Sequence, residues 1–192
     1  MKVHVYEKKR VFDEFFKIDE AKLQYERFDG SMTPVLTRLC FERGDSVAAV
    51  LFNTEENHVV LVEQFRYPAF EKGPGWIIEL VAGMIAVDES PEETMRQELL
   101  EETGYRAGNL EHIGTFYPSP GGSSERIVLF YAEVTNADRI GRGGGLPAEG
   151  EDIRLVHLSL KEVEQKLSAK QIVDAKTIIG LMWLQQNASR RP

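Results

Sequence analysis

One segment of the 192-residue chain carries a complete set of helix start and stop signals. Ser90 is a good N-cap, Pro91 suits the first helical position, and Glu93 completes a capping box with Ser90. Good helix formers follow as far as Glu102, and Gly104 supplies the left-handed residue that ends many helices. Because strand-like segments lie on both sides of this helix, the pattern predicts a mixed α+β fold.

The rest of the chain alternates between strand-like segments and turns. Val47–Phe52 is a continuous apolar run that suits a strand buried on both faces. Further strands are predicted at Lys2–Val5, Phe16–Phe28, Val35–Glu42, His58–Phe65, Trp76–Ala82, Leu110–Phe116, Ile127–Val134 and Ile153–Leu158. Apolar periodicity predicts two more helices, at Leu160–Leu167 and Ile172–Gln186. Residues 1–43 are expected to form a β-rich N-terminal arm, and residues 44–192 the main domain.

Composition limits the classes of function. The net charge is −8 and no basic block is present, so nucleic acid is not an expected partner, because phosphate neutralisation needs clustered Lys and Arg. No apolar run approaches the ~20 residues that span a membrane, so no membrane association is expected. The single cysteine, Cys40, excludes an intramolecular disulfide, and a cytoplasmic location is the default expectation. An acidic chain still binds phosphorylated ligands where metal ions and a few arginines reverse the local field.

The end of the predicted helix concentrates negative charge. Glu98, Glu101 and Glu102 are three or four residues apart, so they share one face of the helix. Their mutual repulsion, and their position near the negative end of the helix dipole, cost free energy. Bound Mg²⁺ or Mn²⁺ would offset this cost, because both ions prefer oxygen ligands. A solvated acidic face is the ordinary alternative, but the bracketing glycines, the caps and the apolar strand before the helix favour a metal site.

The segment from Gly83 to Tyr105 resembles the signature of the Nudix hydrolases, G-x5-E-x7-R-E-U-x-E-E-x-G-U, where U is a bulky apolar residue. The matching positions are Gly83, Glu89, Glu98, Leu99, Glu101, Glu102 and Gly104, with Tyr105 as an acceptable last residue. One position departs from the signature, because Gln97 replaces its Arg and Arg96 comes one residue earlier. In the family this Arg supports the glutamates, so the departure affects that support more than the reaction.

The resemblance extends beyond the signature to the ADP-ribose pyrophosphatase and GDP-mannose hydrolase branch, over roughly Phe15 to Trp183. It is carried by Phe41-Glu42-Arg43-Gly44, Glu63-Gln64-Phe65-Arg66, Glu79-Leu80-Val81-Ala82-Gly83-Met84, Ser119-Pro120-Gly121-Gly122-x-x-Glu125 and Glu149-x-Glu151-Asp152-Ile153. It implies a Nudix α/β/α sandwich preceded by a β-rich dimerisation arm that helps to build a domain-swapped homodimer.

The resemblance also implies roles for the acidic residues. The metal ligands are expected to be Glu98, Glu102, Glu151 and the backbone carbonyl of Ala82, with Mg²⁺ as the cofactor and Mn²⁺ able to substitute. Glu101 is expected to be a further ligand or to orient one. The general base is expected in the glycine-rich loop at residues 136–152, with Glu149 as the base; the reverse assignment of Glu149 and Glu151 stays open.

Four further residues are expected to contact the substrate. By the resemblance, Arg66 and Arg38 correspond to family residues that contact the nucleotide. Arginine suits this role, because a guanidinium matches phosphate oxygens. Phe15 corresponds to an aromatic residue that stacks on the base, and Glu125 to a residue that meets the terminal sugar. The plain alternatives are surface charge for the two arginines and core packing for Phe15.

The predicted reaction is hydrolysis of the pyrophosphate bond of a nucleoside diphosphate sugar, with ADP-ribose, cleaved to AMP and ribose 5-phosphate, as the leading substrate. The alternatives are GDP-mannose and ADP-glucose. The run Gly143-Gly144-Gly145 and the shifted Arg96 resemble the GDP-mannose branch, whereas Val81-Ala82-Gly83-Met84 and Ser123-Ser124-Glu125-Arg126 resemble the ADP-ribose branch. A non-catalytic Nudix sensor of sugar nucleotides is the alternative from another class, and the intact helix glutamates disfavour it.

Overall fold

The structure is a computed structural model that describes residues 1–187, apart from the side chain of Glu149. The chain divides into two compact units. The first consists of residues 1–45 and 117–126, and the second of residues 46–116 and 127–192. The predicted boundary at residue 43 lies close to this division, but the segment 117–126 joins the first unit. It does so through backbone hydrogen bonds, from Phe41 to the Gly122 carbonyl (2.7 Å) and from Ser124 to the Phe41 carbonyl (3.2 Å).

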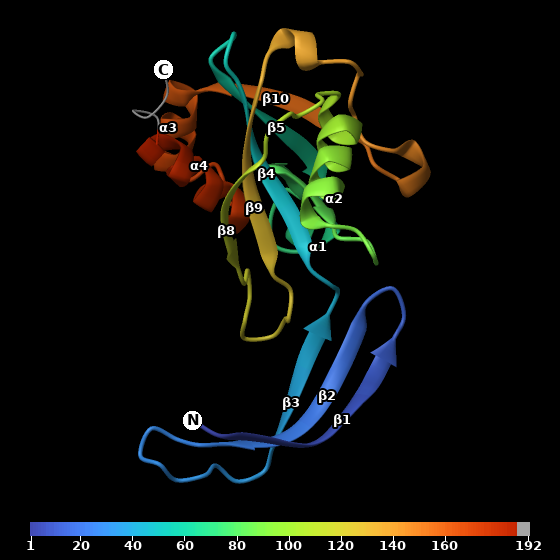
Figure 1. Ribbon diagram of the computed structural model, residues 1–192, viewed down its shortest axis with the longest axis vertical. Coiled ribbons are helices and arrows are strands. Elements are labelled where there is room, and N and C mark those ends of the chain that lie inside the picture. Colours follow the sequence, from blue (N-terminus) through green and yellow to red (C-terminus); the bar gives the residue numbers. More distant parts are fainter. Residues whose placement is uncertain (188–192) are drawn as a thin grey trace. The chain divides into compact units, whose positions relative to one another are not determined.

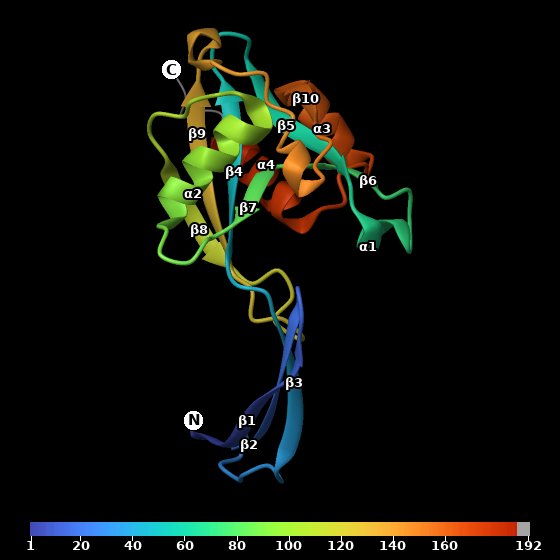
Figure 2. The ribbon, with the colours of Figure 1, turned by 90° about the vertical axis from the view of Figure 1, so that its right-hand side faces the viewer.

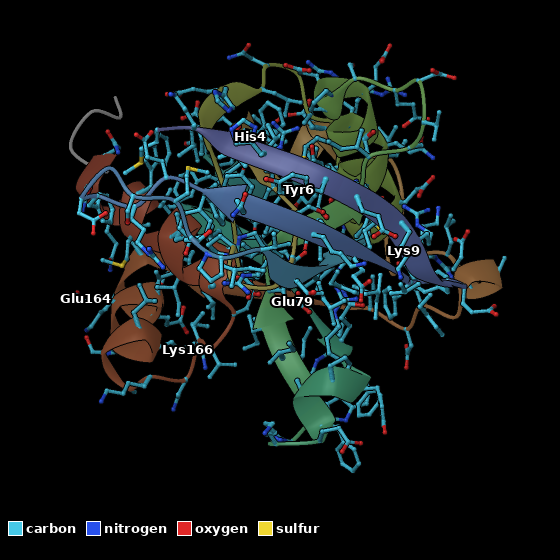
Figure 3. All side chains as sticks on the ribbon, turned by 90° about the horizontal axis from the view of Figure 1, so that it is seen from below. His4, Tyr6, Lys9, Glu79, Glu164 and Lys166 are labelled. Atoms are coloured by element: carbon cyan, nitrogen blue, oxygen red, sulfur yellow. The ribbon has the colours of Figure 1, made fainter. Side chains whose placement is uncertain are left out.

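The first unit is an antiparallel sheet of three strands in the order β1-β2-β3 (Figure 1). The strands are β1 (Val3–Asp13), β2 (Lys17–Tyr25) and β3 (Leu36–Glu42). Strand β1 continues eight residues beyond the predicted Val5, although this part is rich in charge, because it pairs along β2 as far as Asp13 with Lys17. Figure 3 labels His4, Tyr6 and Lys9 along this strand.

The second unit contains a seven-stranded mixed sheet. Its main order is β10-β5-β4-β9-β8, with β6 paired to β5 and β7 paired to β4. The strands are β4 (Ser46–Asn53), β5 (His58–Phe65), β6 (Trp76–Glu79), β7 (Val81–Met84), β8 (Glu111–Phe116), β9 (Ile127–Val134) and β10 (Arg154–Ser159). Strands β4 and β9 are parallel, whereas the other pairs are antiparallel.

Helices cover both faces of this sheet (Figures 1 and 2). Helix α2 (Pro91–Glu98) packs on one face, and α3 (Leu160–Ser168) and α4 (Ala175–Asn187) pack on the other; the short α1 (Tyr67–Phe70) lies between β5 and β6. Alternate residues of β4 enter two separate cores, one with Val47, Ala49 and Leu51 and the other with Ala48, Val50 and Phe52. The continuous apolar run therefore forms the doubly buried strand that was predicted.

The predicted strand Trp76–Ala82 is in fact two strands. Strand β6 pairs with β5 and β7 pairs with β4, so the chain changes partners at Leu80. The backbone N–H of Leu80 donates instead to the Thr177 hydroxyl of α4 (2.8 Å). This change of partner brings the end of β6 and the start of β7 beside the first turn of α4. Among the described residues, no helix is long and apolar enough to cross a membrane.

Candidate active site

The helix that carries the glutamates begins as predicted. Ser90 accepts a hydrogen bond from the Glu93 backbone (3.2 Å), and the Glu93 carboxylate accepts one from the Ser90 backbone (3.0 Å). The end differs from the prediction, because the α-helical part stops at Glu98 and a π-helical turn, Leu99–Thr103, follows before Gly104 at φ +78°. The extra residue of a π turn changes which side chains point inward, and such turns recur at functional sites.

Glu102, within the π turn, is the most buried of the three glutamates. Its side chain is among the largest that are fully buried, at 1% exposure. Its Oε2 atom has no hydrogen-bond partner among the described residues. Burial, followed by the charges of Glu98 and Glu151, raises the pKa of Glu102 to about 8, although the Arg66 guanidinium opposes the shift. A buried carboxylate oxygen without a partner is costly, and a cation would satisfy it.

Glu98 lies directly against the backbone of β7. A Cβ atom placed on Gly83 would stand 1.8 Å from the Glu98 Oε1 atom, so a larger residue here would force the Glu98 side chain to move. Ala82 precedes Gly83 on the same strand and is half-buried. The structure therefore places the signature glycine, the predicted carbonyl donor and one predicted carboxylate ligand together.

These residues suit a divalent cation by their chemistry. Glu98 and Glu151 are close enough to Glu102 to shift its pKa upward, so three carboxylates repel one another in one region. Within the described residues, no three acidic, histidine or cysteine side chains are already grouped as a metal site. The carboxylates would therefore have to turn toward a bound cation. The unpaired oxygen of Glu102 is the observation that indicates room for one.

The replacement of the signature arginine has a local structural solution. The Gln97 side-chain amide donates to the Glu101 carboxylate (3.0 Å), so an uncharged donor supports this glutamate. Arg96 faces elsewhere, and its Nη1 atom donates to the backbone carbonyls of Ala107 (2.7 Å) and Gly108. The arginine one position earlier therefore does not take over the signature role.

The glycine-rich run docks on the end of the glutamate helix. The backbone N–H of Gly144 donates to the Glu102 carbonyl (2.8 Å), and that of Gly145 donates to the Glu101 carbonyl (3.2 Å). A Cβ on Gly143 would come within 2.5 Å of the Glu102 carbonyl oxygen. The glycines are needed because the loop backbone docks on the π turn, where it satisfies carbonyls at the helix end.

The two loop glutamates are placed differently. Glu151 is half-buried, and its Oε2 accepts a hydrogen bond from the Leu146 backbone (2.9 Å) while lying close to the Glu102 charge. Glu149 ends a short 3₁₀ turn, Pro147–Glu149, and its side chain is outside the described part of the chain. The structure thus brings Glu151 to the acidic cluster and leaves the choice of base between the two open.

Arg66 lies at the same cluster. Its Nε donates to Glu79 Oε1 (2.8 Å), and its charge lies close enough to Glu102 for each to shift the other's pKa. Burial lowers the pKa of Arg66. The hydrogen bond to Glu79 and the negative charges of Glu79, Glu102 and Asp174 outweigh burial, so the pKa is raised overall. An open cavity of about 420 Å³ lies in the same unit, lined by Glu63, Trp76, Asp152 and Arg154.

The other predicted substrate residues belong to the first unit. Phe15 lies in the turn between β1 and β2 and is 81% exposed, with Phe16 as its edge-on neighbour at 4.8 Å. Core packing, the plain alternative for Phe15, is therefore wrong. Arg38 is exposed on β3 and donates to the Thr37 carbonyl (3.0 Å), and Glu125 faces Arg43 at 3.8 Å.

Two residues near the glutamates had no role assigned from the sequence. Glu79 ends an otherwise apolar strand, and a buried charge in such a strand needs a partner. Lys176 stands in the first turn of α4, where the helix dipole disfavours a cation. Each is therefore a charge at a position that disfavours it, which is the signal that could have identified it. In the structure Lys176 Nζ lies 2.5 Å from Glu79 Oε2.

Comparisons with known proteins show the family of this chain. A model of the NUDIX domain matches residues 42–178. The chain is 36% identical to a GDP-mannose pyrophosphatase of Pectobacterium atrosepticum, over 93% of this chain and 92% of that one. It is 34% identical to an ADP-ribose pyrophosphatase of Haemophilus influenzae, over 92% and 83%. A crystal structure of an ADP compounds hydrolase shares the fold, with a TM-score of 0.74 and 19% identity over 97% of this chain and 96% of that one.

Proposed function

The chain belongs to the NUDIX family, and from this premise we propose that it hydrolyses the pyrophosphate bond of a nucleoside diphosphate sugar. The products would be a nucleoside monophosphate and a sugar phosphate. The observation that carries the proposal is the buried, unpaired Oε2 of Glu102 within a cluster of like charges. Stability alone would not retain such a group, because an unsatisfied buried polar atom costs about 1–3 kcal/mol.

ADP-ribose is the proposed substrate, cleaved to AMP and ribose 5-phosphate. The similar proteins carry both names, ADP-ribose pyrophosphatase and GDP-mannose pyrophosphatase, at nearly equal identity. GDP-mannose and ADP-glucose therefore remain the competing substrates. A panel of these three compounds, incubated with the protein and Mg²⁺, would separate them by the rate at which each monophosphate appears. Binding of a sugar nucleotide without turnover of any would instead favour a sensor.

Family members generally depend on a divalent metal, and Mg²⁺ is the proposed ion, with Mn²⁺ as a substitute. Glu98, Glu102, Glu151 and the Ala82 carbonyl would hold it. When bound, such an ion neutralises charge on the pyrophosphate oxygens and lowers the pKa of a coordinated water. The chain's own contribution is to fix the ligands, with Gly83 leaving space for Glu98 and Gln97 holding Glu101.

The substrate would be held at both ends. Arg66 is proposed to contact the phosphates beside the acidic cluster, where its side chain is still 42% exposed. Phe15, Arg38 and Glu125 are proposed to contact the base, the nucleotide and the terminal sugar. The first unit is proposed to act as a dimerisation arm in a homodimer, because its apolar side chains are exposed. A cytoplasmic location completes the proposal.

The general base is proposed to be Glu149, with Glu151 as a metal ligand. The support is that Glu151 Oε2 already accepts a hydrogen bond from Leu146 and lies near Glu102, which suits a fixed ligand. Replacing Glu149 by Gln should lower kcat by about 10²–10⁴-fold with little change in substrate affinity, because the proton acceptor is lost. Replacing Glu151 by Gln should instead raise the metal concentration needed for activity. The opposite pair of results would exchange the two roles.

A further inference from the structure

Glu79 is a buried carboxylate that bridges two cations. It ends strand β6, as labelled in Figure 3, and is 3% exposed. Its Oε1 accepts from Arg66 Nε (2.8 Å), and its Oε2 accepts from Lys176 Nζ (2.5 Å). Each oxygen therefore has its own cationic partner. A buried charge of this kind is tolerated only when its partners are well placed.

Lys176 reaches Glu79 from the first turn of α4. Its side chain is 11% exposed, and its Nζ also contacts Asp174 Oδ2 at 3.1 Å. Asp174 precedes the helix and accepts from the Thr177 backbone (3.0 Å) and hydroxyl (2.6 Å). The Thr177 hydroxyl in turn accepts from the Leu80 backbone (2.8 Å). The start of α4 is therefore fastened to the junction between β6 and β7, two residues before Ala82.

The arrangement constrains the orientation of Arg66. Glu79 binds this guanidinium through Nε and one oxygen, because Lys176 occupies the other oxygen. A carboxylate without a second partner would favour a bidentate pair with arginine, which takes two N–H groups at once. Such a pair would turn the guanidinium toward Glu79. With Lys176 in place, the Nη groups remain outside the ion pair, on a side chain that is 42% exposed and lies near Glu102.

We propose that Lys176 is a positioning residue for the reaction: it holds Glu79 so that Arg66 presents its Nη groups to the substrate's phosphates. Lys176 itself touches no substrate. This inference rests on the proposed function, because it assumes that Arg66 binds phosphate. It differs from a purely structural role for Lys176, in which the ion pair would only anchor α4 to the sheet. The two roles predict different kinetics.

The test is a double-mutant cycle with Lys176→Met and Arg66→Met, measured at saturating Mg²⁺. In the wild-type background, Lys176→Met should lower kcat/KM about tenfold or more, mainly through KM, because a misplaced contact loses phosphate binding. In the Arg66→Met background the same change should have almost no further effect, because residues that act through one another are not additive. A structural role would give the same factor in both backgrounds, and that result would overturn the inference.

Two further variants control for folding and charge. Lys176→Arg should recover much of the lost kcat/KM, because a guanidinium also supplies a donor to Glu79. Lys161→Met, which removes an exposed lysine of α3, should match the wild type. Thermal unfolding shows whether Lys176→Met folds. If it does not fold, the double-mutant cycle is measured with Lys176→Gln instead, and its effect on kcat/KM should again vanish in the Arg66→Met background.

A readout without substrate separates this inference from the proposed function. The Nη–H groups of Arg66, observed by NMR, should exchange with water more slowly in Lys176→Met than in the wild type, because a bidentate pair with Glu79 would engage one of them. Lys161→Met should leave this exchange unchanged. If no sugar nucleotide is hydrolysed but the exchange responds as stated, the proposed function fails, while the control of the Arg66 orientation by Lys176 stands. An unaltered exchange rate in Lys176→Met defeats the inference whatever the activity.

Discussion

The two units of this chain bury their side chains in opposite ways. The second unit has two apolar cores, one on each face of its sheet, with β4 contributing to both. In the first unit, all of which the structure describes, no apolar side chain is buried, and the buried residues are Asp19 and Thr33. The second unit therefore has the means to fold by itself, whereas a small sheet without an apolar core is marginal in water.

The first unit is held by strand pairing and ion pairs. Asp19 accepts from Arg10 Nε (2.9 Å) and contacts Lys8 Nζ (3.0 Å), and Lys22 pairs with Glu7 (2.8 Å). The Lys22–Glu7 pair is exposed and contributes only about 0–1 kcal/mol, whereas Asp19 is buried beside its two cations. The comparison teaches that the chain separates two features: the second unit holds the buried glutamate and two apolar cores, and the first unit exposes apolar residues that suit contact with a second copy.

The largest expected effect concerns the second unit. Replacing Glu102 by Gln should lower hydrolysis by at least ~10²-fold, because the proposed cation loses a ligand. The same variant, freed of metal, should unfold at a higher temperature than the wild type at neutral pH, because burial raises the pKa of Glu102 far above its unfolded value and glutamine does not carry this cost. Activity assays and thermal unfolding in EDTA measure the two effects.

The matched control for Glu102 is Glu92→Gln, an exposed glutamate in the first turn of the same helix. It should alter neither activity nor unfolding. Full turnover by Glu102→Gln, or by wild-type protein stripped of metal, would contradict the proposed metal-dependent hydrolysis in the second unit.

The next effect concerns the first unit. Val5 and Val11 are exposed on β1, and lysines at both positions would place charges on a surface proposed to be covered by a second copy. The double variant should sediment as a monomer and should raise KM, whereas the unfolding temperature of the second unit should barely change. Val173→Lys, an exposed apolar position in the second unit, is the control. A wild-type protein that is itself a fully active monomer at micromolar concentration would contradict the dimer.

A smaller effect is expected at Phe15. Stacking on a base contributes about 1–3 kcal/mol by alanine substitution, so Phe15→Ala should raise KM about tenfold or more and leave kcat nearly unchanged. Phe28 offers a control in the same unit, because it is 98% exposed and has no proposed role. Equal kinetics for Phe15→Ala and Phe28→Ala would show that the aromatic ring of Phe15 does not meet the substrate.

Much of the site was predictable because its signals are local. The capping box at Ser90, the stop at Gly104 and the spacing of the glutamates depend on residues within one or two helical turns. The π turn was not predictable, because nothing within Leu99–Thr103 marks it and the residues that dock on it, Gly144 and Gly145, come more than 40 residues further on.

The split of the predicted strand Trp76–Ala82 was hidden for a similar reason. Its residues are suited to strands throughout, and only the pairing with two different neighbours divides it at Leu80. The link from Leu80 to Thr177 spans 97 residues, and the link from Glu79 to Lys176 spans the same distance. The sequence analysis gave Glu79 no role, because the cation that pairs with it lies so far along the chain.

A pair of histidines in the second unit also escaped the sequence, since they are 99 residues apart. His157 Nδ1 and His58 Nε2 are 2.6 Å apart, and the rings pack edge to face at 4.4 Å. Burial lowers the pKa of both, and the charge of Arg139 lowers that of His157 further, while Glu56, 3.4 Å from His58, opposes the shift. The unfolded chain therefore takes up protons below pH ~6.5 that the folded pair resists.

The smallest predicted effect follows from this difference in proton uptake. Glu102, whose pKa is raised to about 8, stabilises the fold as the pH falls through the same range, so the histidine effect is measured in the Glu102→Gln background. In that background the second unit should lose stability as the pH falls below ~6.5, because protonation of histidines with a lowered pKa favours the unfolded state. In the first unit the pKa of Asp19 is lowered, first by the hydrogen bond from Arg10, so its stabilising contribution persists above pH ~3.9 and is lost only in stronger acid. Both tryptophans, Trp76 and Trp183, lie in the second unit, so urea unfolding followed by their fluorescence reports that unit alone. The urea concentration at the midpoint of unfolding should decrease as the pH is lowered from 7.5 to 5.5. Over the same range, the amides of β1 and β2 should stay protected from exchange in NMR spectra. Replacing both histidines by Gln in the same background should flatten the fluorescence midpoint over this range; an unchanged pH dependence would show that other groups cause it.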